Sequence, residues 1–82
     1  MHETTKDMLR SLFNKRRIGG KHTEEANLFR RIKHLSRAEQ SAIIEDWEKC
    51  MKDGFVIRLK KTSEFHVSLN PEKLKEILEM IQ

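Results

Sequence analysis

The spacing of apolar residues changes abruptly at Gly54, and this change constrains the fold of the chain more than any other feature. Before Gly54, apolar residues recur at steps of three and four, as on one side of an α-helix. Ser36 and Glu39 have the spacing of a capping box, and Gly54 can adopt the left-handed conformation that ends a helix. We therefore expect a helix from Ser36 to Asp53, with an inward side that consists of Ile43, Ile44, Trp47, Cys50 and Met51.

After Gly54 the spacing becomes two: Phe55, Ile57 and Leu59 alternate with Val56, Arg58 and Lys60, and Phe65, Val67 and Leu69 alternate with His66 and Ser68, which predicts a β-hairpin with one apolar face. Directly opposed residues in a hairpin share a face, so the odd-numbered apolar residues should pair with one another. A two-residue loop would instead place Leu59 opposite His66. The predicted register therefore has the loop Lys61-Thr62-Ser63 and the pairs Leu59 with Phe65, Ile57 with Val67, Phe55 with Leu69 and Lys60 with Glu64.

Residues 4–17 are predicted to form the first helix, with Thr4 or Thr5 as its cap and Lys15-Arg16-Arg17 in its last turn. Its apolar stripe comprises Met8, Leu9, Leu12 and Phe13. Gly19 and Gly20 then break the helical pattern, and Ile18 is the apolar anchor of this break. A short β-bridge from the break to the hairpin is one arrangement that this segment permits.

Thr23 is predicted to cap a second helix, which carries Leu28, Phe29 and Ile32 on its inward side and is followed by Leu35. Only a few residues separate it from the helix that begins at Ser36, as in a helix-turn-helix. Asn70 and Pro71 indicate the start of a last helix, because asparagine is a favourable cap and proline suits the first helical position. Leu74, Ile77, Leu78 and Ile81 form its stripe, with Met80 at the rim.

The chain has 82 residues, enough for one domain with a modest core, here assigned to residues 1–82. The formal net charge is +4, and it is unevenly distributed. Residues 1–35 contain nine Lys or Arg against four Asp or Glu, whereas residues 36–55 contain three against five. Any surface for an anionic partner should therefore lie mainly on the first 35 residues.

Several classes of chemistry lack the residue patterns that they need. The single cysteine, Cys50, excludes an internal disulfide and is placed on the apolar side of its helix, where it would be a poor nucleophile. Gly19-Gly20-Lys21 lacks the rest of a nucleotide-binding P-loop. The four histidines, His2, His22, His34 and His66, do not have zinc-site spacing with Cys50. We expect no enzyme, no metal site and no cofactor.

The sequence contains no apolar run of about 18 residues and no hydrophobic leader at its start. With one cysteine, this composition fits a reducing compartment. The expected protein is soluble and cytoplasmic, without membrane contact, and is a monomer or a homodimer.

The order helix, short strand, helix, helix, hairpin, helix resembles the winged helix-turn-helix family, in which the third helix is the recognition helix and the hairpin is the wing. The residues that carry this resemblance are Ser36–Asp53, Gly54 and Phe55–Leu69. Residues 19–23 and 60–71 also resemble those of small stand-alone archaeal winged-helix proteins of unassigned function. The resemblance implies an α+β, mainly α fold: a three-helix core with a helix-turn-helix, a two-stranded wing and a C-terminal helix.

Membership of this family implies DNA binding as the most common role, although many winged helices make only protein contacts. Three groups of residues suit phosphate binding. They are Lys21 and His22 at the entry to the second helix, Lys60, Lys61 and Thr62 on the wing, and Arg16, Arg17, Arg30 and Arg31, with Lys33, on the basic exterior. The alternatives are an ordinary glycine turn, a sheet edge protected by lysines and a solvated charged surface, respectively.

The outer face of the predicted recognition helix does not favour recognition of a specific DNA sequence. Arg37 and Ser41 can reach base edges, but Glu45 and Asp46 on the same outer face would meet phosphates. We therefore expect a DNA-binding protein, such as a transcriptional regulator, that mostly contacts the phosphate backbone of double-stranded DNA. The alternative is a protein-interaction adaptor, or a subunit of a larger assembly, that presents its third helix to a partner.

Overall fold

The computed structural model describes residues 1–82 and has an α+β fold that is mainly helical, with 57% helix and 18% strand, as expected. The α-helices are α1 (Glu3–Asn14), α2 (Glu25–Phe29), α3 (Arg37–Lys52) and α4 (Leu74–Ile81). The strands are β1 (Thr23–Glu24), β2 (Val56–Lys61) and β3 (Glu64–Leu69), and short 3₁₀ turns cover Arg30–Ile32 and Pro71–Lys73. The sheet is antiparallel with the order β1-β3-β2.

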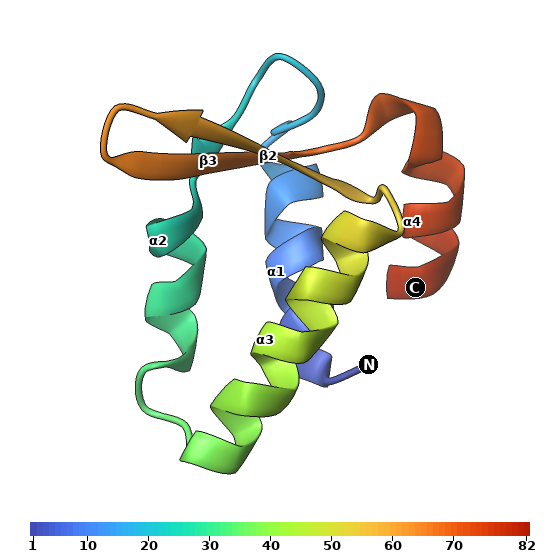
Figure 1. Ribbon diagram of the computed structural model, residues 1–82. Coiled ribbons are helices and arrows are strands. Elements are labelled where there is room, and N and C mark those ends of the chain that lie inside the picture. The colour runs from blue at the N-terminus through green and yellow to red at the C-terminus, as the bar shows by residue number, and fades with distance from the viewer.

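The sheet lies across one end of the helices, and the turn between α2 and α3 lies at the opposite end (Figure 1). The core fills the space between these elements: its fully buried side chains include Met8, Leu9, Leu12, Ile43, Trp47, Val67, Leu69 and Ile77. The Phe29 ring packs edge-on against Trp47, with ring centroids 5.9 Å apart. No helix combines the length and the apolar composition that a membrane span requires.

The ends of α3 confirm the predicted caps. The Glu39 backbone N–H donates to Ser36 Oγ over 3.2 Å, while Glu39 Oε1 accepts from the Ser36 hydroxyl rather than from its backbone N–H. Gly54 has φ +80°, and the Phe55 N–H bonds back to the Cys50 carbonyl, as in a Schellman ending.

The predicted inward side of α3 is only partly correct. Ile43, Trp47 and Cys50 are buried and Met51 is half-buried, but Ile44 is 45% exposed. The prediction for Ile44 was wrong because the apolar positions span more of the helix circumference than the core covers. Ile44 is therefore an apolar residue on the outer side of α3.

α1 begins and ends at residues other than those predicted. His2, not Thr4 or Thr5, is the cap: its Nδ1 accepts from the Thr4 N–H. The helix ends at Asn14, so Lys15-Arg16-Arg17 do not form its last turn. Arg16 instead adopts the left-handed conformation, with φ +58°, and the Arg17 N–H bonds to the Leu12 carbonyl.

The segment after α1 joins the sheet, as the sequence allowed. Ile18 forms an isolated β-bridge with Leu69, and Thr23 of β1 pairs with Val67 of β3. The predicted Thr23 cap is therefore wrong, because Thr23 belongs to a strand; α2 begins after Glu24, which makes no side-chain cap. The inward positions of Leu28 and Ile32 are confirmed.

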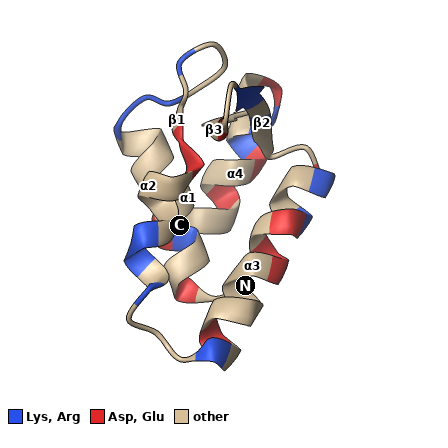
Figure 2. Cartoon of the chain, turned by 60° about the vertical axis from the view of Figure 1, so that its left-hand side comes forward, with Lys and Arg blue, Asp and Glu red and all other residues tan.

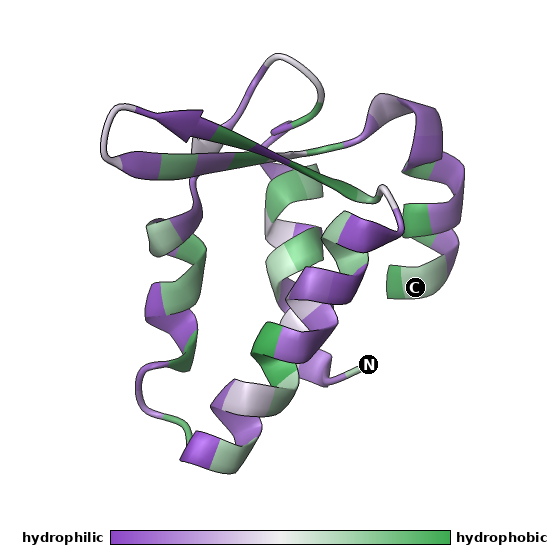
Figure 3. Cartoon of the chain, in the orientation of Figure 1, coloured by the Kyte–Doolittle hydropathy of each residue, from purple (hydrophilic) through white to green (hydrophobic).

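The hairpin has the two-residue loop that the predicted pairing of odd-numbered apolar residues excluded. Thr62 and Ser63 alone form the loop, and the pairs include Arg58 with Val67, Leu59 with His66, Lys60 with Phe65 and Lys61 with Glu64. Hydrophobic and hydrophilic bands alternate along the hairpin (Figure 3), but the inward face of β2 carries Val56 and Arg58, not Ile57 and Leu59.

An inward arginine is stable here because Glu25 Oε2 accepts hydrogen bonds from Arg58 Nη2 (2.7 Å) and Nε (3.0 Å). The Arg58 guanidinium also lies 5.0 Å from the centroid of the Phe65 ring. A charged residue thus occupies a position that the hydrophobic pattern assigned to apolar side chains. Leu59, at 41% exposure, lies on the outer face of the sheet.

Asn70 connects the hairpin to the last helix. Its Oδ1 accepts from the Glu72 N–H and its Nδ2 donates to the Gly54 carbonyl, so the predicted cap is confirmed, although it caps the 3₁₀ turn before α4. Ile77 and Ile81 are buried, Leu74 and Leu78 are half-buried, and Met80 packs at the rim of the core as expected.

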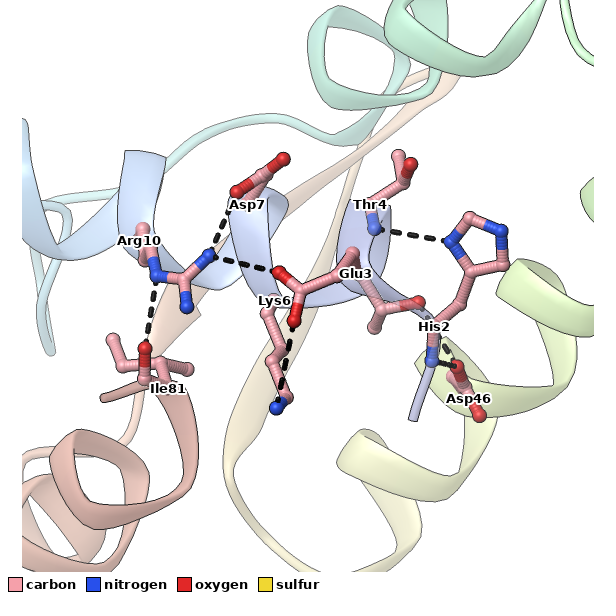
Figure 4. Close-up of polar contacts among 9 residues, drawn as sticks. His2, Glu3, Thr4, Lys6, Asp7, Arg10, Asp46 and Ile81 are labelled. Atoms are coloured by element: carbon pink, nitrogen blue, oxygen red, sulfur yellow. Dashed lines mark hydrogen bonds and ion pairs between the residues drawn. The ribbon is translucent and has the colours of Figure 1, made fainter.

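Polar contacts join α1 and its cap residue His2 to α3 and α4 (Figure 4). Asp46 Oδ2 accepts from the His2 N–H (2.8 Å) and from the Thr5 hydroxyl (3.0 Å), and Arg10 Nε donates to the Ile81 carbonyl (2.9 Å). Asp46 was expected to face phosphates from the outer side of α3. It instead satisfies groups of α1, so it contributes little to the outer charge of α3.

Candidate anion-binding pocket between α1 and α2

A hollow of about 400 Å³ lies between the end of α1 and the α2–3₁₀ segment. Its charged residues are all basic: Lys15, Arg17, Arg30 and Arg31. Ser11, Thr23 and Asn27 add polar groups, and no carboxylate lines it. We refer to this hollow as the basic pocket.

The backbone after α1 determines the position of Arg17. The left-handed Arg16 turns the chain, so that the Arg17 N–H reaches Leu12 and the Arg17 carbonyl accepts from the Leu69 N–H over 2.9 Å. Both backbone groups of Arg17 are therefore satisfied within the fold. Its side-chain Nε is buried and has no hydrogen-bond partner, the only such buried side-chain atom in the protein.

The other cations come from the 3₁₀ turn and from the end of α1. Arg31 Nη2 donates to Ser11 Oγ over 2.8 Å, which ties the turn to α1, whereas Arg30 and Lys15 are exposed at the mouth. None of the four cations forms an ion pair with a carboxylate of the chain. Like charges around one hollow repel one another, so a bound anion would lower the electrostatic energy of the pocket.

A second hollow adjoins the basic pocket and shares Ser11, Lys15 and Arg31 with it. Asp7 and Arg10 complete its charged lining, and these two form an ion pair of 2.8 Å. Asp7 and Arg10 therefore neutralise each other. The excess positive charge is concentrated in the basic pocket itself.

The structure brings together some of the predicted site residues. Arg17, Arg30 and Arg31 all line the basic pocket. Arg16 does not: its guanidinium lies 5.6 Å from the centroid of the Phe13 ring. Sequence reasoning assigned Lys15 to the helix end and missed Ser11, Thr23 and Asn27 as lining residues. The run Lys15-Arg16-Arg17 was the available signal, but the reversal at Arg16 decides which of its members face the pocket.

The remaining predicted residues lie elsewhere. Lys60, Lys61 and Thr62 are exposed on β2 and the hairpin tip, where Thr62 has φ +43°. Lys21 is exposed in the loop before β1, whereas His22 bonds through Nδ1 to His66 Nδ1 over 2.9 Å. Desolvation, with the charges of His66, Lys61 and Arg17, lowers the pKa of His22. His22 therefore tends to be neutral and is a poor phosphate contact.

Arg37 and Ser41 are exposed on α3, with the carboxylate of Glu39 between them in the sequence. Figure 2 shows acidic positions (red) along α3 with basic positions (blue) at its ends, and further basic positions near α2. Glu45 and Glu48 are exposed, and Glu48 lies 3.5 Å from Arg58. With Asp46 turned toward α1, three exposed carboxylates balance three exposed cations on α3, so this helix offers a phosphate backbone no excess positive charge.

The chain matches no known protein-family model, no curated protein and no solved structure.

Proposed function

We propose that this protein is a winged-helix protein that binds double-stranded DNA through its phosphates, with the basic pocket as the principal contact. The observation that carries this proposal is the group of four cations, without a carboxylate partner, around one hollow. The element order and the strand order β1-β3-β2 support the winged-helix assignment.

Arginine suits this role because its guanidinium presents several donors to phosphate oxygens in a fixed plane. Arg17 lines the pocket and its side chain makes no ion pair within the chain, and Arg30 and Lys15 offer exposed charge at the mouth of the pocket. Such contacts hold the backbone of a duplex without reading its bases. In the proposed complex the exposed lysines of the wing, Lys60 and Lys61, contact neighbouring phosphates.

In this binding mode α3, which has no excess positive charge, does not make the main contact with the duplex. The expected DNA binding is therefore weakly sequence-dependent, as in an architectural or general regulatory protein, and a role in transcription regulation remains part of the proposal. Arg37 and Ser41 contribute only if the duplex also reaches the start of α3.

The test is fluorescence anisotropy with a labelled random-sequence duplex at several salt concentrations. For B-DNA, log affinity falls with log salt by about 0.9 per neutralised phosphate. Arg30→Ala should weaken binding on all sequences alike and reduce the slope by about one contact. Lys75→Ala is the matched control, because Lys75 is exposed on α4 and makes no ion pair. Absence of binding at low salt would refute the proposal.

A second candidate function rests on the outer side of α3. Ile44, which is 45% exposed, lies next to the exposed carboxylate Glu45 and one turn from Glu48. A basic, partly apolar protein segment would complement this apolar residue and the carboxylates beside it. Under this alternative the protein is an adaptor, and Ile44→Lys abolishes partner binding without changing anisotropy with DNA.

A further inference from the structure

Four side chains with metal-binding atoms meet where β1 pairs with β3, on the outer face of the sheet. The register places Glu24 of β1 directly opposite His66 of β3, and Glu64 lies two residues before His66 on the same strand. Residues with this relationship share one face of a sheet as immediate neighbours. His22, from the segment just before β1, approaches His66 from the other side of its ring.

The distances are compatible with a shared ion. The ligand atoms of Glu24, Glu64 and His66 all lie within 4.8 Å of one another, and His66 Nε2 is 3.0 Å from Glu64 Oε1. Ligands around a tetrahedral zinc ion are separated by about 3.4 Å, given bonds of about 2.1 Å. Rotation of the two glutamate side chains, one exposed and one half-buried, can close the remaining gap.

His22 orients the histidine of this group. The two Nδ1 atoms are 2.9 Å apart and the rings are nearly perpendicular, at 82°. If His66 Nδ1 donates to His22 Nδ1, the lone pair of a neutral His66 lies on Nε2 and is directed toward the two carboxylates. This is the arrangement of an imidazole ligand whose second nitrogen is held by a neighbouring acceptor.

We propose that Glu24, Glu64 and His66 bind a divalent transition-metal ion of the zinc type, with His22 as the hydrogen-bond partner that orients His66. The ion would bind the Nε2 lone pair of this tautomer, and water would complete its coordination. It would also reduce the repulsion between two carboxylates that lie close together. Lys61, opposite Glu64 in the hairpin, makes no ion pair with this group.

An imidazole nitrogen in the ligand set favours Zn²⁺ over Mg²⁺, which prefers oxygen ligands only. Because Glu24 belongs to a two-residue edge strand and the other ligands to β3, a bound ion would cross-link the sheet at this edge. The proposal is independent of DNA binding: the basic pocket and the metal site share no residue.

Isothermal titration of the chelator-treated full chain with ZnCl₂, and separately with MgCl₂, tests the site at pH 7. We expect one Zn²⁺ per chain, a raised unfolding midpoint and no comparable binding of Mg²⁺. Glu24→Gln and His66→Gln should each lower the zinc affinity at least about tenfold, and His22→Phe by about 10- to 100-fold. Circular dichroism establishes that each variant is folded.

His34→Gln and Glu72→Gln are the matched controls, because both residues are exposed and lie outside the group. Unchanged zinc affinity in the controls, together with the losses above, supports the assignment. The proposal is overturned if the wild-type chain does not bind Zn²⁺. Equal affinities of Glu24→Gln, His66→Gln and wild type would also overturn it, since zinc would then bind elsewhere.

Discussion

The indole Nε1 of Trp47 donates a 2.8 Å hydrogen bond to Oε2 of Glu25, which joins the middle of α3 to the first residue of α2. The same oxygen accepts from Arg58 on β2. One carboxylate oxygen of α2 therefore connects this helix to α3 and to β2. The Glu25 side chain is only 13% exposed, so its charge is stabilised mainly by these donors.

Removal of Glu25 should destabilise the protein, because Trp47 and Arg58 lose their shared acceptor. We expect Glu25→Ala to lower the free energy of unfolding by about 3 kcal/mol, and Glu25→Gln by about 1–2 kcal/mol, since the amide keeps an acceptor but not the charge. Urea unfolding followed by Trp47 fluorescence measures both. Glu76→Gln, on an exposed pair with Lys73, should change stability by less than about 0.5 kcal/mol. Equal costs at the two positions would contradict this account.

The left-handed turn after α1 should become more favourable with glycine. Arg16 has φ +58°, where a side chain clashes with its own backbone and glycine does not. Arg16→Gly and Arg16→Ala both remove the contact with Phe13, so their difference isolates the backbone term. We expect the glycine variant to be about 1 kcal/mol more stable than the alanine variant by thermal unfolding. A more stable alanine variant would mean that residue 16 is not left-handed in solution.

Local signals in the sequence predicted most of the helices. The Ser36 cap, the Gly54 ending and the Asn70 cap depend on neighbouring residues, and all three are confirmed. The predicted register of the hairpin was wrong because the true register depends on a residue outside the hairpin. Arg58 faces inward only because Glu25 provides a carboxylate there, and no alternation pattern within the hairpin contains that information.

The candidate sites also depend on contacts between residues that are distant in the sequence. The basic character of residues 1–35 was evident, but the reversal at Arg16 and the fold of α2 decide that Arg17, Arg30 and Arg31 share one pocket while Arg16 does not. His22 and His66 are 44 residues apart in the sequence, and the strand register brings them together. Histidine spacing along the chain could not indicate it.

The observed register distinguishes two residues that the sequence placed on the same inward face. Val67 is fully buried, whereas Leu59 is 41% exposed on the outer face. Val67→Ala should therefore cost about 2 kcal/mol and Leu59→Ala less than about 1 kcal/mol, despite the larger side chain. Chemical denaturation of both variants gives the comparison. A larger cost at Leu59 would favour the three-residue loop and the pairing of Leu59 with Phe65.

Burial of Cys50 should make stability depend on alkaline pH. Desolvation, with the nearby Asp46 and Asp53, raises the pKa of this thiol from 9.0 to about 11. The unfolded chain releases the thiol proton near pH 9 while the folded chain retains it, so the free energy of unfolding should fall as pH rises from about 9 to about 11. A shift of this size corresponds to a loss of at most about 2.7 kcal/mol. Urea titrations across this range, with Cys50→Ala as the reference that lacks the thiol, isolate the contribution. If wild type and Cys50→Ala lose stability in parallel, the thiol is accessible to water in the folded protein, and it should then react with a disulfide reagent at pH 8 as fast as the unfolded chain does.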